Sequence, residues 1–153
     1  MTTTTTETTE VLNDLININN DRIEGYKKAA EESKAMDVDL HALFTKMADE
    51  SRLNVSALTQ HVVALGGEPD SGSTGIGKIY RAWMDVKAVF TGKDRVSILE
   101  SCEFGEDQAQ NAYDDALASD AELDVETRKL ITSQKETLKQ SHDDIKRLRD
   151  IGK

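Results

Sequence analysis

The sequence predicts an all-α four-helix bundle, and three observations support that prediction. The 153-residue chain contains one Pro and nine Gly, and such a low content of helix breakers favours long helices over many short strands. Four long segments place apolar residues at steps of three and four, which puts them on one helix face. Short turns follow the first and third segments. The first and second segments should therefore be antiparallel neighbours, and so should the third and fourth.

The four expected helices are about as long as the helices of a typical bundle. They cover about residues 9–34, 38–65, 95–118 and 124–150. Their inward stripes run over residues 12–30, 44–65, 99–116 and 131–148. Together the helices form a single domain over residues 9–153, long enough to bury a core.

The N-terminus, MTTTTTETTE, has neither a basic segment nor an apolar one, and is therefore not expected to be a signal peptide. We expect residues 1–8 to form a disordered Thr-rich tail that leads into the cap of the first helix.

The link over residues 66–93 differs from the short turns. In "GGEPDSGSTG", Gly66 and Gly67 can cap the second helix, and Pro69 prevents its continuation. The following "IGKIYRAWMDVKAVFTG" places Trp83 and Phe90 on one face, which predicts a short fifth helix. About 15 helical residues cover about 22 Å, and the loop supplies the rest of a bundle length of about 38 Å. The crossover therefore makes the second and third bundle helices parallel, in an up-down-down-up order.

Composition excludes several classes of function. The formal net charge of -10 argues against nucleic-acid binding, since phosphate contacts need a basic surface. No apolar run approaches the length of about 18 residues that a membrane helix needs. One Cys allows no internal disulfide, in keeping with the expected cytoplasmic location.

Seven stretches resemble a known family. They are "VLNDLI", "GYKKAAEES", "LFTKMADES", "LGGEP", "RAWMDVKAVFTG", "CEFGEDQAQNAYDDAL" and "SHDDIKRLRD", in matching order over about residues 10–150. The chain resembles a bacterial ferritin-like four-helix-bundle family that is catalogued as a domain of unknown function. The resemblance implies a ferritin-like fold and supplies no activity. More distantly, the chain is similar to rubrerythrins and bacterioferritins, whose di-iron sites draw carboxylates and histidines from all four helices.

A ferritin-type di-iron site needs a Glu on two helices and a Glu-x-x-His on the other two, and this sequence lacks the second element. The three histidines are residues 41, 61 and 142, and the residues three places before them are Val38, Leu58 and Lys139. A Lys at that place puts a positive charge beside any ferrous ion, which is the wrong sign.

Polar side chains interrupt the apolar stripes near the middle of the bundle, and two interpretations remain open. The first is a hydrogen-bonded polar core layer that fixes the helix register. Its members are Asn19, Ser51, Asn54, Gln134 and Ser141, together with Glu106. The second is a remodelled metal site, with iron or another divalent ion as its cofactor. Its candidate ligands are Glu50, Glu103, Glu106 and His142, with Glu24 as a contributor from the first helix.

Four other residues have structural interpretations. Cys102 lies on the third stripe, which predicts a buried apolar role. Tyr26 and Tyr113 should be core aromatics whose hydroxyl groups reach the polar layer. His61 is expected to make a polar contact at the end of the bundle.

The leading functional hypothesis is a non-enzymatic bundle protein that requires no cofactor. It would act through its surface or by self-association, as a homo-oligomer or with an unknown protein partner. An association with stress rests on ferritin-like relatives alone. The alternative is a carboxylate-bridged di-metal oxidase or iron-handling protein. A third hypothesis is a partner-binding module that uses the acidic outer faces and the Thr-rich tail.

Overall fold

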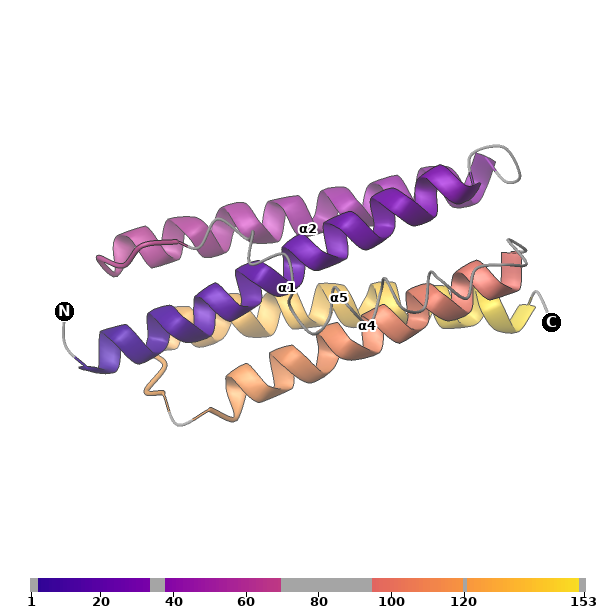
Figure 1. The fold of residues 1–153 in the computed structure, drawn as a ribbon. Coiled ribbons are helices and arrows are strands. Elements are labelled where there is room, and N and C mark those ends of the chain that lie inside the picture. The colour runs from indigo at the N-terminus through magenta and orange to yellow at the C-terminus, as the bar shows by residue number, and fades with distance from the viewer. Residues whose placement is uncertain (1–2, 34–37, 70–94, 120, 152–153) are drawn as a thin grey trace.

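The computed structural model describes residues 3–33, 38–69, 95–119 and 121–151 (Figure 1). The described residues contain four helices and no strand. The helices are α1 (Thr3–Ser33), α2 (Val38–Ala64), α4 (Arg95–Leu117) and α5 (Val125–Ile151). The predicted all-α class and the four bundle helices are therefore confirmed. The expected short helix of the crossover, with Trp83 and Phe90, lies outside the described residues.

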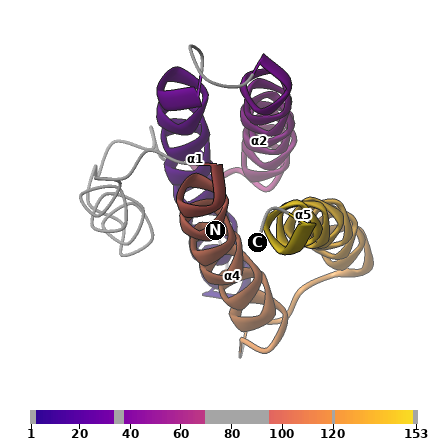
Figure 2. The same ribbon diagram turned by 90° about the vertical axis from the view of Figure 1, so that its right-hand side faces the viewer.

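Each helix packs against two antiparallel neighbours. Helix α1 lies between α2 and α4, and α5 contacts α4 and α2, as the view along the bundle shows (Figure 2). Helices α2 and α4 occupy opposite corners and run in the same direction (Figure 1). As a result, α2 ends and α4 begins at opposite ends of the bundle.

Helix α1 begins earlier than the sequence indicated. It already includes residues 3–8, for which a disordered tail was expected. Thr8 and Thr9 are buried, and the Thr8 hydroxyl donates a hydrogen bond to the carbonyl oxygen of Glu122 at 3.4 Å. Thr has a modest intrinsic helix propensity, so packing against the segment before α5 accounts for the extra turns better than local preference.

Two capping arrangements fix the ends of α2 and α5. Gly66 has a φ of 82°, and the Gly67 amide donates to the carbonyl oxygen of Val62 at 3.0 Å, which is a Schellman cap. Gly66 and Gly67 thus cap α2, as the sequence indicated. At the start of α5, Asp124 Oδ1 accepts a hydrogen bond from the Thr127 amide at 2.7 Å. This backbone hydrogen bond lowers the pKa of Asp124, because it stabilises the carboxylate form.

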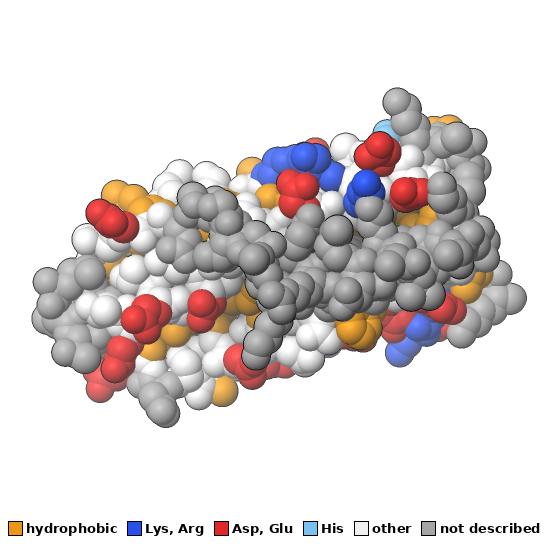
Figure 3. Space-filling model, viewed as in Figure 1, with side chains coloured by type: hydrophobic (Ala, Val, Ile, Leu, Met, Phe, Trp, Pro, Cys, Tyr) orange, Lys and Arg blue, Asp and Glu red, His pale blue; other side chains and the backbone are white. Residues whose placement is uncertain are grey.

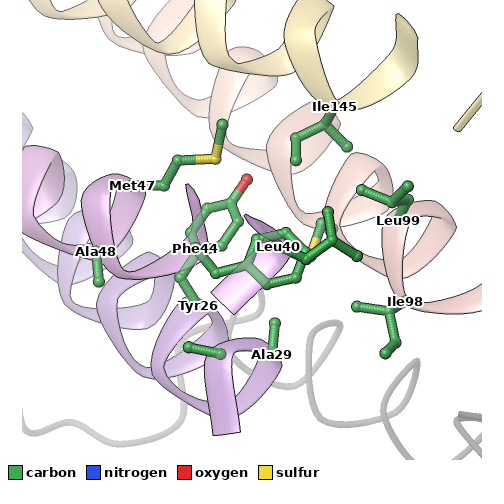
Figure 4. Packing of buried hydrophobic residues seen from close by; sticks show 11 residues of the cluster. Tyr26, Ala29, Leu40, Phe44, Met47, Ala48, Ile98, Leu99 and Ile145 are labelled. Atoms are coloured by element: carbon green, nitrogen blue, oxygen red, sulfur yellow. The ribbon is translucent and has the colours of Figure 1, made fainter. Parts of the chain in front are cut away.

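The core consists of two apolar clusters separated by polar residues. One cluster contains Tyr26 and Phe44, whose ring centroids are 5.7 Å apart, and Figure 4 shows these rings facing Ile98, Leu99 and Ile145 of the opposite helices. The second cluster lies toward the other end of the bundle. Its buried members are Leu12, Leu15, Ile16, Leu58, Val62, Ala109, Tyr113, Ala116, Ile131 and Leu138. Polar residues from all four helices meet between the clusters.

The described surface carries many charged side chains and a few exposed apolar ones, among them Val38, Leu53 and Ile151. Acidic side chains are spread over the face shown in Figure 3 rather than gathered in one place. Within the described ranges, no helix is sufficiently long and apolar to cross a membrane.

Candidate functional site

A buried ion pair joins α1 and α4 between the two apolar clusters. The side chains of Arg22 and Glu106 are each about 1% exposed or less. Arg22 Nε lies 2.5 Å from Glu106 Oε1, and Arg22 Nη2 lies 3.4 Å from Oε2. Two such contacts form the bidentate fork that guanidinium and carboxylate groups favour.

The remaining polar surface of Arg22 is also occupied. Its Nη1 donates to the carbonyl oxygen of Met47 at 2.9 Å and to the Ser51 hydroxyl at 2.8 Å, both on α2. Its guanidinium carbon lies 4.9 Å from the centroid of the Tyr26 ring, a cation–π distance. Burial, the largest single influence, would lower the pKa of Arg22, but the charge of Glu106, the hydrogen bond to it and the nearby Tyr26 and Glu50 together leave that pKa raised. Arg22 is therefore a permanent cation at the bundle centre.

A chain of hydrogen bonds continues from this pair across the four helices. Asn19 Oδ1 accepts from the Ser51 hydroxyl at 3.0 Å and from Asn54 Nδ2 at 3.1 Å. Asn19 Nδ2 donates to the Tyr113 hydroxyl at 2.8 Å, which donates to Gln134 Oε1 at 2.7 Å. Gln134 Nε2 donates to the backbone carbonyl oxygen of Asn54 at 3.3 Å. All five side chains are buried, so these bonds satisfy groups that water does not reach.

Three of the candidate metal ligands join no three-ligand cluster in the described part of the chain. Glu106 is bound to Arg22. Glu50 accepts a hydrogen bond from the hydroxyl of buried Ser141 at 3.2 Å, and its charge also acts on Arg22. Glu24 is 54% exposed on the outside of α1. None of the three belongs to a group of three or more potential metal ligands among the described residues.

The other two candidates, Glu103 and His142, do come together. They form a cluster with Asp107, in which one potential ligand atom from each residue lies within 4.8 Å of the others. His142 Nε2 is 2.6 Å from Asp107 Oδ1, and Glu103 forms an ion pair with Arg149. The cluster joins α4 to α5 and is partly open to solvent.

Sequence reasoning missed Arg22 and Asp107. Arg22 follows Asn19 by three residues and precedes Tyr26 by four, so it continues the inward stripe of α1. Asp107 follows Glu103 by four residues, which places both carboxylates on one side of α4. The helical spacing of both residues was therefore an available signal.

The buried ionisable side chains near the pair are held in their neutral forms. Burial, and then the negative charge of Glu106, raise the pKa values of Tyr26 and Cys102 well above their usual values. Cys102 is buried, as predicted, and its protonated thiol is a poor nucleophile. Burial likewise raises the pKa of Tyr113. At the end of the bundle, His61 Nε2 lies 2.7 Å from the Thr127 hydroxyl, in keeping with the expected polar contact.

These observations define a helical-bundle protein with a charged, hydrogen-bonded centre. The chain belongs to the family described as a domain of unknown function (DUF2383), whose family model matches residues 7–119. The predicted membership of a family of unknown function is thereby confirmed. The matched region contains most of α1 and all of α2 and α4, including both partners of the central ion pair. No curated protein matches the chain.

Proposed function

We propose that the protein is a non-enzymatic, ferritin-like bundle protein whose centre contains a protein cation in place of metal ions. The observation that supports this most directly is the buried pair of Arg22 and Glu106. The guanidinium of Arg22 contacts both carboxylate oxygens of Glu106, the candidate metal ligand that the sequence places on the inward stripe. The protein would then act in the cytoplasm through its outer surface, with a second copy or another protein as partner.

The energetics of the pair support this proposal. Removing one member of a buried ion pair typically destabilises a protein by about 3–5 kcal/mol, because the other charge stays buried without a partner. A metal ion would have to displace Arg22 from Glu106, from Ser51 and from the backbone of Met47. It would also have to tolerate the fixed positive charge nearby, which repels any divalent cation.

The arrangement of the helices supports the ferritin-like part of the proposal. Helices α2 and α4 run in the same direction (Figure 1). A bundle with one long connection between its second and third helices is the topology of ferritin-like folds. The absence of Glu-x-x-His from the sequence then explains why the centre is occupied differently.

The experiment is a count of iron in the purified chain, prepared without a metal-affinity tag. Ferrous iron is added anaerobically, and the bound metal is measured after desalting. We expect the wild type, Glu106→Ala and Glu136→Ala to retain the same amount of iron; Glu136 is an exposed glutamate of α5 and serves as the matched control. Retention of about two irons per chain, the number a di-iron centre holds, and their loss in Glu106→Ala alone would overturn the proposal.

One observation favours a second candidate function, a carboxylate-bridged di-metal protein. Glu50 of α2 and Glu106 of α4 both act electrostatically on Arg22, so two carboxylates converge on one central position. In this alternative, Arg22 leaves the centre and metal ions take its place. The same count decides between the two functions, because only the alternative requires central iron that is sensitive to Glu106→Ala.

A further inference from the structure

A second cluster of charged side chains lies between α4 and α5, away from the central pair. Glu103 and Asp107 are one helical turn apart on α4, and His142 faces them from α5. The potential ligand atoms of all three lie within 4.8 Å of one another. Ligands held tetrahedrally at about 2.0–2.2 Å from one ion are about 3.3–3.6 Å apart, so a small rotation of the side chains would bring the three onto a single ion.

The exposure of the cluster suits a site with an entry path. The side chains of Glu103 and His142 are 14% and 18% exposed, whereas that of Asp107 is 54% exposed. The first two are therefore positioned by their surroundings, and the third lies on the solvent side. An ion bound there would keep at least one water ligand.

The orientation of the imidazole is an independent indication. His142 Nδ1 lies 3.1 Å from Asp143 Oδ1, while Nε2 points at Asp107. Metal-bound histidines typically donate their other ring N–H to a carboxylate, which fixes the ring and its tautomer. Asp143 supplies that carboxylate and leaves Nε2 as the ligand atom.

We propose that Glu103, Asp107 and His142 form a mononuclear binding site for a divalent cation of the zinc class. One imidazole and two carboxylates suit Zn²⁺ or Co²⁺ better than Ca²⁺ or Mg²⁺, which prefer oxygen ligands throughout. The ion replaces Arg149 as the cation beside Glu103, and Arg149 keeps its ion pair with Asp150 at 2.8 Å. This site is independent of the central pair and of the function proposed above.

The test is titration of the tag-free chain with zinc chloride in a calorimeter. We expect saturation at about one ion per chain, as for a single site of three protein ligands completed by water. His142→Gln and Asp107→Asn should each weaken binding by at least about tenfold, because each removes a ligand. The matched controls are His41→Gln and Asp49→Asn, a histidine and an exposed aspartate outside the cluster, and both should bind as the wild type does. Far-UV circular dichroism establishes that each variant is folded.

Two further variants sharpen the test. Arg149→Gln should tighten binding several-fold, since it frees Glu103 from a competing cation. Glu106→Ala should leave the zinc stoichiometry unchanged, because Glu106 belongs to the central pair and not to this cluster. The zinc titration and the iron count therefore test the two proposals separately. Absence of saturable binding below millimolar zinc, or binding that survives both His142→Gln and Asp107→Asn, would overturn the site. If Arg149→Gln binds zinc more weakly than the wild type, the proposal that the ion takes the place of Arg149 beside Glu103 is wrong.

Discussion

The guanidinium of Arg22 on α1 and the carboxylate of Glu106 on α4 form an ion pair at the bundle centre that is closed to solvent, with Nε and Oε1 2.5 Å apart. The pair lies beside the hydrogen-bonded layer that separates the two apolar clusters. It fixes the register of α1 against both α2 and α4, because Arg22 also binds Met47 and Ser51. The charge at the centre is thus balanced by the protein itself.

Removal of Arg22 should be among the most destabilising single changes in the described part of the chain. Arg22→Met should lower the free energy of unfolding by about 3–5 kcal/mol, since Glu106 is left buried without its cation. The double variant Arg22→Met/Glu106→Leu should recover most of that loss, because it removes both charges. Urea denaturation of the wild type and of these two variants measures the differences. Arg52→Ala, which removes a surface arginine paired with Asp49, should change stability by less than about 1 kcal/mol; a similar loss in Arg52→Ala and Arg22→Met would contradict this account.

The hydroxyl group of Tyr113 connects α1 to α5. Tyr113→Phe leaves Asn19 Nδ2 and Gln134 Oε1 without this partner in a buried layer. We expect a loss of about 1–3 kcal/mol in the free energy of unfolding. A double-mutant cycle with Asn19→Ala should give a coupling energy clearly different from zero. Additive effects of Tyr113→Phe and Asn19→Ala would show that the two side chains do not act together.

Gly67 should tolerate no side chain while Thr9 lies beside it. A Cβ at Gly67 would be 2.7 Å from Thr9 Cγ2 and 2.8 Å from Oγ1. Gly67→Ala should therefore lower the melting temperature, and Thr9→Ala should relieve part of that loss in the double variant. At Gly66 the space is open but φ is 82°, so Gly66→Ala should lose about 1 kcal/mol that Thr9→Ala cannot restore. Equal rescue of both glycine variants by Thr9→Ala would contradict the steric explanation.

Asp124 should make the stability of the start of α5 depend on pH. Its pKa is lowered in the folded state by the hydrogen bond from the Thr127 amide, so its contribution is present above the unfolded pKa, which is about 3.9. That contribution is lost as the pH falls through the lower, folded pKa. Asp124→Ala should lower stability by about 1 kcal/mol at neutral pH, the usual loss of an N-cap.

Asp124→Asn isolates the pH effect, because Asn caps a helix without titrating. In thermal melts between neutral and strongly acidic pH, the difference in stability between wild type and Asp124→Asn should shrink or reverse as the pH falls. A difference that is constant over the whole range would show that Asp124 contributes no linkage between folding and protonation.

The sequence by itself determined the helices, because amphipathic spacing is a local property. Its bounds for α2, α4 and α5 agree with the structure to within one residue. It also indicated that Glu106 faces inward and that Gly66 and Gly67 end α2. At the Thr-rich start of α1 the intrinsic helix propensity is low, and the sequence there indicated a disordered tail. In the structure Thr8 and Thr9 are buried.

Only the tertiary structure decided which partner each polar residue on the inward helix faces binds. The spacing of Arg22 places it on the inward stripe, but the residue type argues for the surface, because burying a cation is unfavourable unless a partner is present. That partner, Glu106, is 84 residues away along the chain. The cluster of Glu103, Asp107 and His142 likewise depends on how α4 and α5 are aligned. Helical spacing fixes which residues share a face, whereas the pairing of charges depends on distances between helices that only packing sets.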